Sequence, residues 1–197
     1  MHSNYLKTKK NTLLLILSLI FMGAFHIATI RPGNDWGGDF GLYIEHAKNI
    51  VEGKNFVDTH YIYNPEMPFH PKNYPPVFPL LLAPVYKIFG LNLTVMKIEI
   101  VLLFILSLTV FFLLLKNEIP FYYLIILILV IGLNPFISDR KDHILSDIPF
   151  ILLSYLFLFF LNKKYELKKH SFWLDLSIPF LLYLSYACRN MVRKRVT

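Results

Sequence analysis

The sequence predicts an all-α fold, a polytopic membrane helix bundle of about five transmembrane helices. Hydrophobic residues make up 55% of the 197 residues, and charged residues only 17%, which is below the roughly 25% that is usual in soluble domains. The basic residues lie in short clusters between apolar runs, a placement that orients helices in membrane proteins. A nucleic-acid-binding protein would gather its net charge of +7 on one solvated face, so nucleic acid is not an expected partner.

The first expected span covers residues 12–30 and follows the basic residues Lys7, Lys9 and Lys10. Crossing about 30 Å of hydrocarbon takes roughly 20 apolar residues, so this segment is long enough. A cleaved signal peptide is the alternative, but its apolar region is usually about 7–15 residues long and ends at small residues. Because this stretch is longer and leads into Arg31, we expect an uncleaved anchor.

Four further apolar segments are expected to be spans two to five, and the fourth is short for a full crossing. The excess of positive charge in cytoplasmic loops sets the orientation. It places the N-terminus in the cytoplasm of a multi-pass protein of the cell (inner) membrane, and two loops, 31–93 and 138–147, outside. The four segments lie within residues 91–115, 121–137, 148–161 and 172–188.

The basic tail at residues 189–195 breaks this orientation rule, because span five should end on the outer face. One explanation is that span five is re-entrant or absent, which leaves the tail in the cytoplasm. The other, which we favour, is that the chain is the N-terminal part of a longer protein, cut short or shifted in frame near Arg189.

The first outer loop, residues 31–93, contains an expected amphipathic helix at 39–52. Its apolar residues recur at intervals of three and four, which places them on one helical face, and Glu45, Lys48, Asn49 and Glu52 lie on the other. Asp39 stands at the N-cap position and Gly53 ends the pattern. We expect this helix to lie in the outer membrane interface.

The second half of this loop, residues 73–90, is apolar but contains four prolines, which disfavour an ordinary spanning helix. We expect interfacial or re-entrant structure packed against the spans. Asp147 ends the other outer loop and precedes Ile148 and Pro149, so an N-cap is expected there too. Both aspartates fall at the outer membrane edge, where carboxylates are commonly functional.

Three segments together resemble a known family: G-D-F-G-L-Y-I-E-H-A-K-N-I-V-E-G (38–53), Y-P-P-V-F-P-L-L-L-A-P-V-Y-K-I-F-G (74–90) and L-S-D-I-P-F (145–150). They are similar to the start of the GT-C membrane glycosyltransferases, in the branch of protein O-mannosyltransferases and aminoarabinose transferases. The resemblance implies that residues 1–197 are a single membrane domain, the N-terminal part of a longer transferase module. It also implies sugar transfer from a polyprenyl-phosphate donor to a hydroxyl acceptor on the outer face.

The resemblance further implies roles for individual residues. Asp39 would take the proton of the acceptor, and Asp147 would orient the acceptor or help to hold a divalent metal ion. The expected donor contacts are Arg140, Lys141, Lys72 and Tyr74. The chain departs from its relatives at two places: Asp39 is followed by Phe40 instead of a second acid, and Asn73 and Tyr74 replace an acid and a lysine.

The alternative function is a non-enzymatic multi-pass scaffold or a transporter-like subunit. In that protein the two aspartates only cap helices and lie far apart. In a transferase they converge on one outward-facing cavity beneath residues 73–90. His26, inside the first span, is expected to be a hydrogen-bond partner between helices.

Overall fold

The computed structural model describes residues 9–33, 39–59, 73–167 and 172–189, and within these ranges it is helical with no strand. This confirms the expected all-α class. The helices are α1 (Lys9–Ala28), α2 (Phe40–Glu52), α3 (Val77–Phe89), α4 (Leu93–Leu115), α5 (Phe121–Gly132), α6 (Pro135–Arg140), α7 (Asp147–Leu167) and α8 (Phe172–Tyr186).

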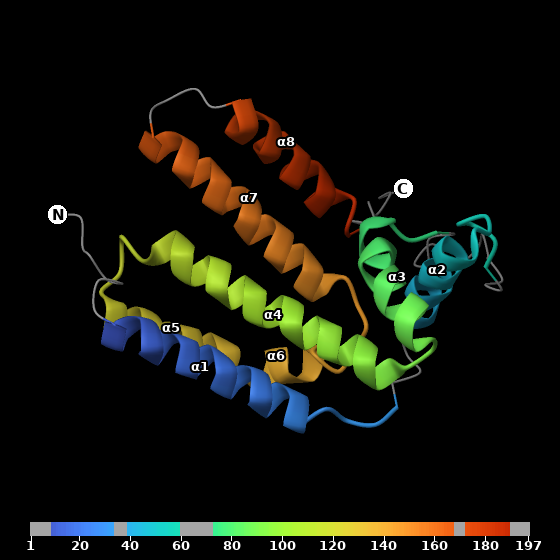
Figure 1. Cartoon of the computed structure of the whole chain (residues 1–197), viewed down its shortest axis with the longest axis horizontal. Helices are drawn as coiled ribbons and strands as arrows, with labels where there is room; N and C mark the ends of the chain where they lie inside the picture. The colour runs from blue at the N-terminus through green and yellow to red at the C-terminus, as the bar shows by residue number, and fades with distance from the viewer. Residues whose placement is uncertain (1–8, 34–38, 60–72, 168–171, 190–197) are drawn as a thin grey trace, which may run out of the picture.

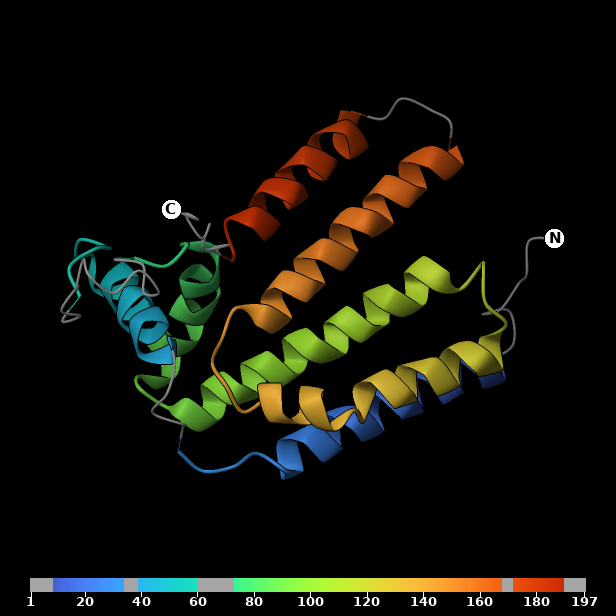
Figure 2. The same ribbon diagram turned by 180° about the vertical axis from the view of Figure 1, so that it is seen from behind.

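Helix α4 occupies the middle of the bundle (Figures 1 and 2). It packs against α7 on one side, which in turn packs against α8, and against α1 and α5 on the other side. Helices α2 and α3 lie together at the end of the bundle where α1 ends and α4 and α7 begin. The opposite end gathers the first residues of α1 and the last residues of α4 and α7, and with them Lys9, Lys10, Lys116 and Lys163.

Three of the described helices, α1, α4 and α7, are long and apolar enough to cross a membrane. They correspond to the first, second and fourth expected spans. Helix α7 has 21 residues and is longer than the expected 148–161, because it starts at Asp147 and continues past residue 161. Helices α5 and α8 are apolar but have only 12 and 15 residues.

The third expected span, residues 121–137, is not one helix. Helix α5 ends at Gly132, and Asn134 is extended and accepts a hydrogen bond from the Phe136 N–H to begin α6. The physical reason is Pro135, because a residue before proline is disfavoured in the helical conformation. His26 Nε2 lies 2.7 Å from the Gly132 carbonyl oxygen, which confirms His26 as a hydrogen-bond partner between helices.

Helix α2 confirms the amphipathic prediction, and Gly53 ends it with a φ of 66°, a value that glycine adopts without strain. The buried side is wider than expected. Asn49, expected on the polar face, is buried, and its Nδ2 donates to the Asp58 carbonyl at 2.7 Å. His46 is also buried, with Nδ1 2.7 Å from the Phe56 carbonyl.

Helix α3 forms from the proline-containing segment 73–90 and packs between α2 and α4. Its 13 residues rise about 20 Å, too little to cross a membrane. Pro79 lies in the first turn, where a backbone N–H has no carbonyl partner within the helix, so the N–H that proline lacks is not needed. Phe78 and Leu82 are fully buried, so the apolar side of this helix belongs to the core.

Candidate functional site

Tyr43 connects the two outer segments that carry the expected acids. Its hydroxyl lies 3.1 Å from the Ser146 hydroxyl, next to Asp147. Its own N–H donates to the Asp39 carbonyl at 3.3 Å, one turn earlier in α2. The Tyr43 ring is buried and packs against Tyr74 and Phe78, with ring centroids 4.6 and 4.9 Å away. The start of α2 is therefore fixed against the start of α7.

Both aspartates act electrostatically on this phenol. Burial is the main reason that the pKa of Tyr43 is raised to about 12, and the negative charges of Asp39 and Asp147 act in the same direction. Coulombic effects of this kind fall off with distance. The two aspartates are 108 positions apart in the chain, and the segments that carry them both contact Tyr43, through the Ser146 hydroxyl and the Asp39 backbone carbonyl.

The expected helix caps are only partly confirmed. Asp39 stands at the N-cap position of α2, as predicted, but its side chain makes no capping hydrogen bond, and its backbone is helical with φ −80° and ψ −1°. Asp147 is not the N-cap of α7, because it is the first residue inside that helix, one position after the N-cap. The carbonyl of the preceding Ser146 accepts the Phe150 N–H at 2.9 Å, so Ser146 takes the position that was expected for Asp147.

The carboxylate of Asp147 faces two guanidinium groups. Arg189 Nη1 lies 2.8 Å from Oδ1, and Arg140 Nη1 lies 4.0 Å from Oδ2. Each guanidinium also stacks on a ring, Arg140 on Phe136 and Arg189 on Phe150. The site thus combines one carboxylate with two positive charges held in place by aromatic contacts.

Arg189 is a site residue that sequence reasoning missed, because it was assigned to the anomalous basic tail. The residues just after α8 dock on the same end of the bundle as α2 and α3 (Figure 1). The Val77 N–H donates to the Ala187 carbonyl at 3.3 Å, and the buried Cys188 Sγ lies 3.9 Å from the Ser146 carbonyl. These contacts place Arg189 beside Asp147 and not at the end that carries Lys116.

The other expected donor contacts are placed differently. Tyr74 is in the site, but its ring packs on Tyr43 and its N–H lies 3.4 Å from His46 Nε2. Lys141 is not brought to this site, because its side chain is buried in a separate cluster described below. Lys72 lies outside the described residues.

The surroundings of Asp147 do not fit a divalent metal ion. Both of its oxygens face a guanidinium, and a cation would have to displace that positive charge. Within the described residues, His, Cys, Asp and Glu side chains form no group of three that could hold a metal.

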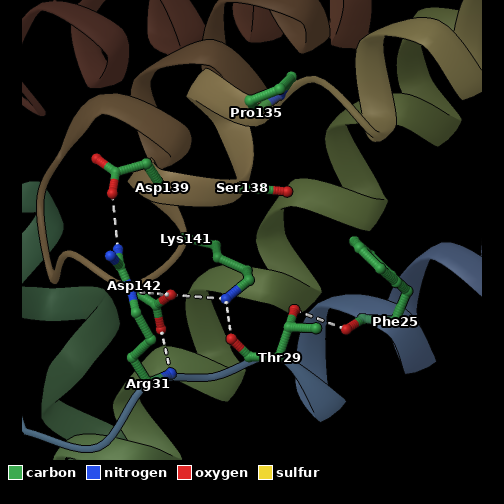
Figure 3. A pocket seen from close by; sticks show the side chains of 8 residues that line it. All are labelled: Phe25, Thr29, Arg31, Pro135, Ser138, Asp139, Lys141 and Asp142. Atoms are coloured by element: carbon green, nitrogen blue, oxygen red, sulfur yellow. Dashed lines mark hydrogen bonds and ion pairs between the residues drawn. The ribbon is translucent and has the colours of Figure 1, made fainter.

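A second cluster surrounds Asp142 in the loop between α6 and α7 (Figure 3). Its carboxylate accepts hydrogen bonds from the Arg31 N–H at 3.0 Å, Arg31 Nε at 3.1 Å and Lys141 Nζ at 2.7 Å. Lys97 Nζ is 3.7 Å away. Burial raises the pKa of Asp142, but the bonds from Lys141 and Arg31 outweigh it and hold the pKa below its ordinary value.

The two lysines of this cluster bind the backbone that follows α1. Lys97 Nζ donates to the Arg31 and Gly33 carbonyls at 2.8 and 2.5 Å, and Lys141 Nζ donates to the Thr29 carbonyl at 2.8 Å. The carbonyls at a helix C-terminus lack intrahelical donors and carry partial negative charge. The lysines therefore fix the path of the chain as it leaves α1 toward Asp39.

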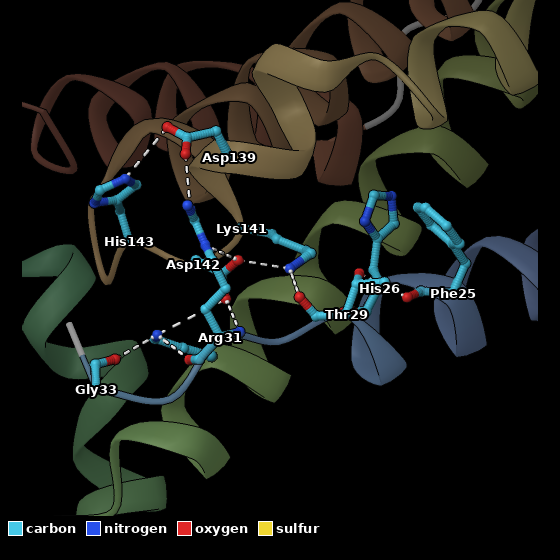
Figure 4. Close-up of polar contacts among 10 residues, drawn as sticks. Phe25, His26, Thr29, Arg31, Gly33, Asp139, Lys141, Asp142 and His143 are labelled. Atoms are coloured by element: carbon cyan, nitrogen blue, oxygen red, sulfur yellow. Dashed lines mark hydrogen bonds and ion pairs between the residues drawn. The ribbon is translucent and has the colours of Figure 1, made fainter. Parts of the chain in front are cut away.

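The more exposed part of this cluster, the side chains of Arg31, Asp139 and His143, lies beside two cavities. Asp139 accepts from Arg31 Nη2 at 2.7 Å, and its other oxygen lies 3.4 Å from His143 Nε2. Figure 4 shows these polar contacts. Beside them is a cavity of about 380 Å³, lined by Arg31, Pro32, Gly33, Lys97, Asp139, Asp142 and His143. A neighbouring cavity of about 310 Å³ shares the Arg31–Asp139 pair and reaches Thr29 and Ser138 (Figure 3).

The fold thus defines an all-helical protein with three described helices that are long and apolar enough to cross a membrane. No protein-family model, curated protein or solved structure matches the chain. The function is therefore inferred from the residues of the site.

Proposed function

We propose that the chain is a membrane glycosyltransferase of the GT-C type. It would move a sugar from a polyprenyl-phosphate donor to a hydroxyl acceptor on the outer face. The observation that carries the proposal is the junction at Tyr43, where the segments of Asp39 and Asp147 meet at one end of the bundle. A scaffold whose aspartates only capped helices would not require this convergence.

The proposal includes five membrane crossings, with α5 and α8 in addition to α1, α4 and α7. Helix α5 packs along α1, and α8 packs along α7, in both views of the bundle. The end with Lys9, Lys10, Lys116 and Lys163 would face the cytoplasm, since positive charge accumulates there. The end with α2, α3, Asp39 and Asp147 would face outward.

In the proposed reaction the acceptor oxygen attacks the anomeric carbon of the sugar. The bond from that carbon to the phosphate oxygen breaks, and the phosphate leaves with the electron pair. The acceptor proton passes to the carboxylate of Asp39, a general-base role that typically contributes about 10²–10⁴-fold in rate. Arg140 and Arg189 lie where positive charge can stabilise the leaving phosphate.

The test uses the full chain in membrane vesicles with a panel of polyprenyl-phosphate hexoses and pentoses. Release of polyprenyl phosphate is measured by mass spectrometry, so the acceptor need not be known in advance. We expect release with at least one donor and a loss of about 10²-fold or more in Asp39→Asn. Asp58→Asn, an exposed aspartate in the loop after α2, is the matched control.

A panel that gives no release in the unmodified chain, with α2 and α7 folded, argues against an active transferase. It then favours the alternative function, a non-enzymatic multi-pass scaffold or a transporter-like subunit. Release that is unchanged in both Asp39→Asn and Asp147→Asn would refute the assignment of the site. Asp147→Asn is expected to retain more activity than Asp39→Asn, because it is not the base.

A further inference from the structure

We propose that the cavity beside Arg31 is a binding site for a phosphate group, separate from the site at Asp39 and Asp147. Arg31, Lys97, Asp139, Asp142 and His143 line this cavity of about 380 Å³. Figure 4 shows the polar contacts that join Arg31, Asp139, Asp142 and His143. The ligand is an oxyanion that a guanidinium can bind, either the phosphate of a lipid head group or free phosphate. The inference does not depend on the proposed glycosyl transfer.

The buried part of the cluster has an excess of positive charge. Lys97, Lys141 and Asp142 have side chains that are 2%, 2% and 4% exposed, so two ammonium groups share one carboxylate. The backbone carbonyls after α1 supply dipoles but no full negative charge. A buried charge without a counter-charge is costly, and an anion in the adjoining cavity would supply that counter-charge.

Arg31 offers hydrogen-bond donors to such an anion. Its Nε binds Asp142 and its Nη2 binds Asp139, but Nη1 has no hydrogen-bond partner among the described residues. The Arg31 side chain is 60% exposed and borders both cavities. The planar fork of a guanidinium matches phosphate geometry and binds it through two parallel hydrogen bonds.

Asp139 binds the same guanidinium group, that of Arg31, that a phosphate would bind. Its ion pair with Arg31 is exposed on both sides, at 60% and 53%, and exposed pairs of this kind contribute little to stability. Asp142, by contrast, is buried and bound by three donors, so it stays in place. A phosphate can therefore displace Asp139 from Arg31 without disturbing the buried charges.

The position of the cavity favours a lipid head group as the source of the phosphate. Arg31 follows the last turn of α1, and Lys97 lies in the second turn of α4. Both helices are long and apolar enough to cross a membrane, so their ends lie at the depth of the lipid head groups. An anionic lipid at this edge would place its phosphate within reach of Arg31.

The test compares charge-removing variants in the full chain. Asp139→Asn removes a negative charge and releases Arg31, so we expect phosphate to bind about three- to tenfold more tightly. Arg31→Gln removes the donor fork, so we expect binding at least about tenfold weaker. Glu52→Gln and Lys54→Gln are matched controls, because these residues form an ion pair of the same 2.7 Å length outside the cavity.

Inorganic phosphate binding is measured by ³¹P NMR in detergent, and lipid binding by native mass spectrometry from nanodiscs of phosphatidylcholine with or without phosphatidylglycerol. A lipid site is identified if Asp139→Asn retains the most phosphatidylglycerol, the wild type less, and Arg31→Gln the least. The same order with inorganic phosphate alone identifies a free-phosphate site. Equal binding in these three proteins, or equal changes in the control variants, overturns the proposal. Asp139→Asn is expected to bind phosphate more tightly, so this variant still tests the proposal if Arg31→Gln misfolds.

Discussion

Replacing Asp142 with asparagine should destabilise the protein strongly, although Asp142 lies outside every described helix. The carboxylate receives hydrogen bonds from Arg31 and Lys141 and lies near Lys97. The Asp142→Asn substitution keeps the size of the side chain but leaves both buried ammonium groups without a counter-charge. The connection after α1, which these lysines hold through backbone carbonyls, would then loosen.

The magnitude follows from the burial of this cluster. Removing one partner of a buried ion pair typically costs about 3–5 kcal/mol. For a chain of about this length each kcal/mol lowers Tm by roughly 2–4 °C, so we expect a decrease of about 6–20 °C. The matched control is Asp139→Asn, whose exposed ion pair with Arg31 should contribute no more than about 1 kcal/mol.

The chain carries its own probe for this assay. Cys188 is the single cysteine in the sequence, and it is buried. Unfolding in detergent can therefore be followed with a thiol-reactive fluorophore during a temperature ramp. Each variant is measured at the same pH and detergent concentration, so that only the charge in the cluster changes.

A double variant separates charge from shape. Asp142→Asn with Lys141→Met restores the original excess of one buried positive charge, so part of the lost Tm should return. If Asp142→Asn lowers Tm no more than Asp139→Asn does, the buried cluster does not stabilise the fold as argued. Lys141→Met is also measured alone in the otherwise unmodified protein. If adding it to Asp142→Asn lowers Tm by as much as it does alone, the charge argument is refuted.

Three further predictions concern other buried groups. His26→Leu should lower stability by about 1–3 kcal/mol, seen as a lower Tm, because the Gly132 carbonyl loses its donor; an unchanged Tm would mean that water replaces the imidazole. Burial lowers the pKa of His46 from its ordinary 6.5, so the stability it contributes is complete above that value and decreases as the pH falls below it. A Tm–pH profile should show this slope, and His46→Gln should flatten it. Burial raises the pKa of Cys188 from 9.0 to about 12, so the native thiol should alkylate about a thousandfold more slowly than an exposed cysteine near neutral pH. Fast labelling of the folded protein would contradict the docking of the chain end after α8.

Much of the fold follows from the apolar pattern. The helical class, the positions of α1 and α4 to within three residues, and α2 with its end at Gly53 were all predicted from local sequence, because helix periodicity and capping act over a few residues. The predicted third span, residues 121–137, runs five residues past the end of α5 at Gly132. Pro135 in the sequence indicates a helix end at this place. The convergence of Asp39 and Asp147 was an expectation from the family resemblance, and the contacts of Tyr43 support it without establishing the reaction.

The residues of both sites were only partly predictable. Arg140 lies 4.0 Å from Asp147 and the Tyr74 ring packs on Tyr43, but the donor contacts expected of these two residues stay a prediction. Lys141 follows Arg140 in the sequence, yet its side chain lies in the separate cluster around Asp142. Arg189 and Asp142 gave no local signal. Lys97 did, since a lysine close to an apolar span is costly and needs a partner, but its partners could not be named.

By itself, the sequence determines that this protein is helical, apolar enough for a membrane, and asymmetric in charge along the chain. These properties are sums over neighbouring residues, so they can be read without knowing the fold. Only the tertiary structure decided which charges meet. Asp142 joins Arg31 across 111 positions, and Asp147 joins Arg189 where the end of α8 returns to the start of α7. Contacts between distant residues depend on how the helices pack, and many packings are compatible with the same apolar pattern.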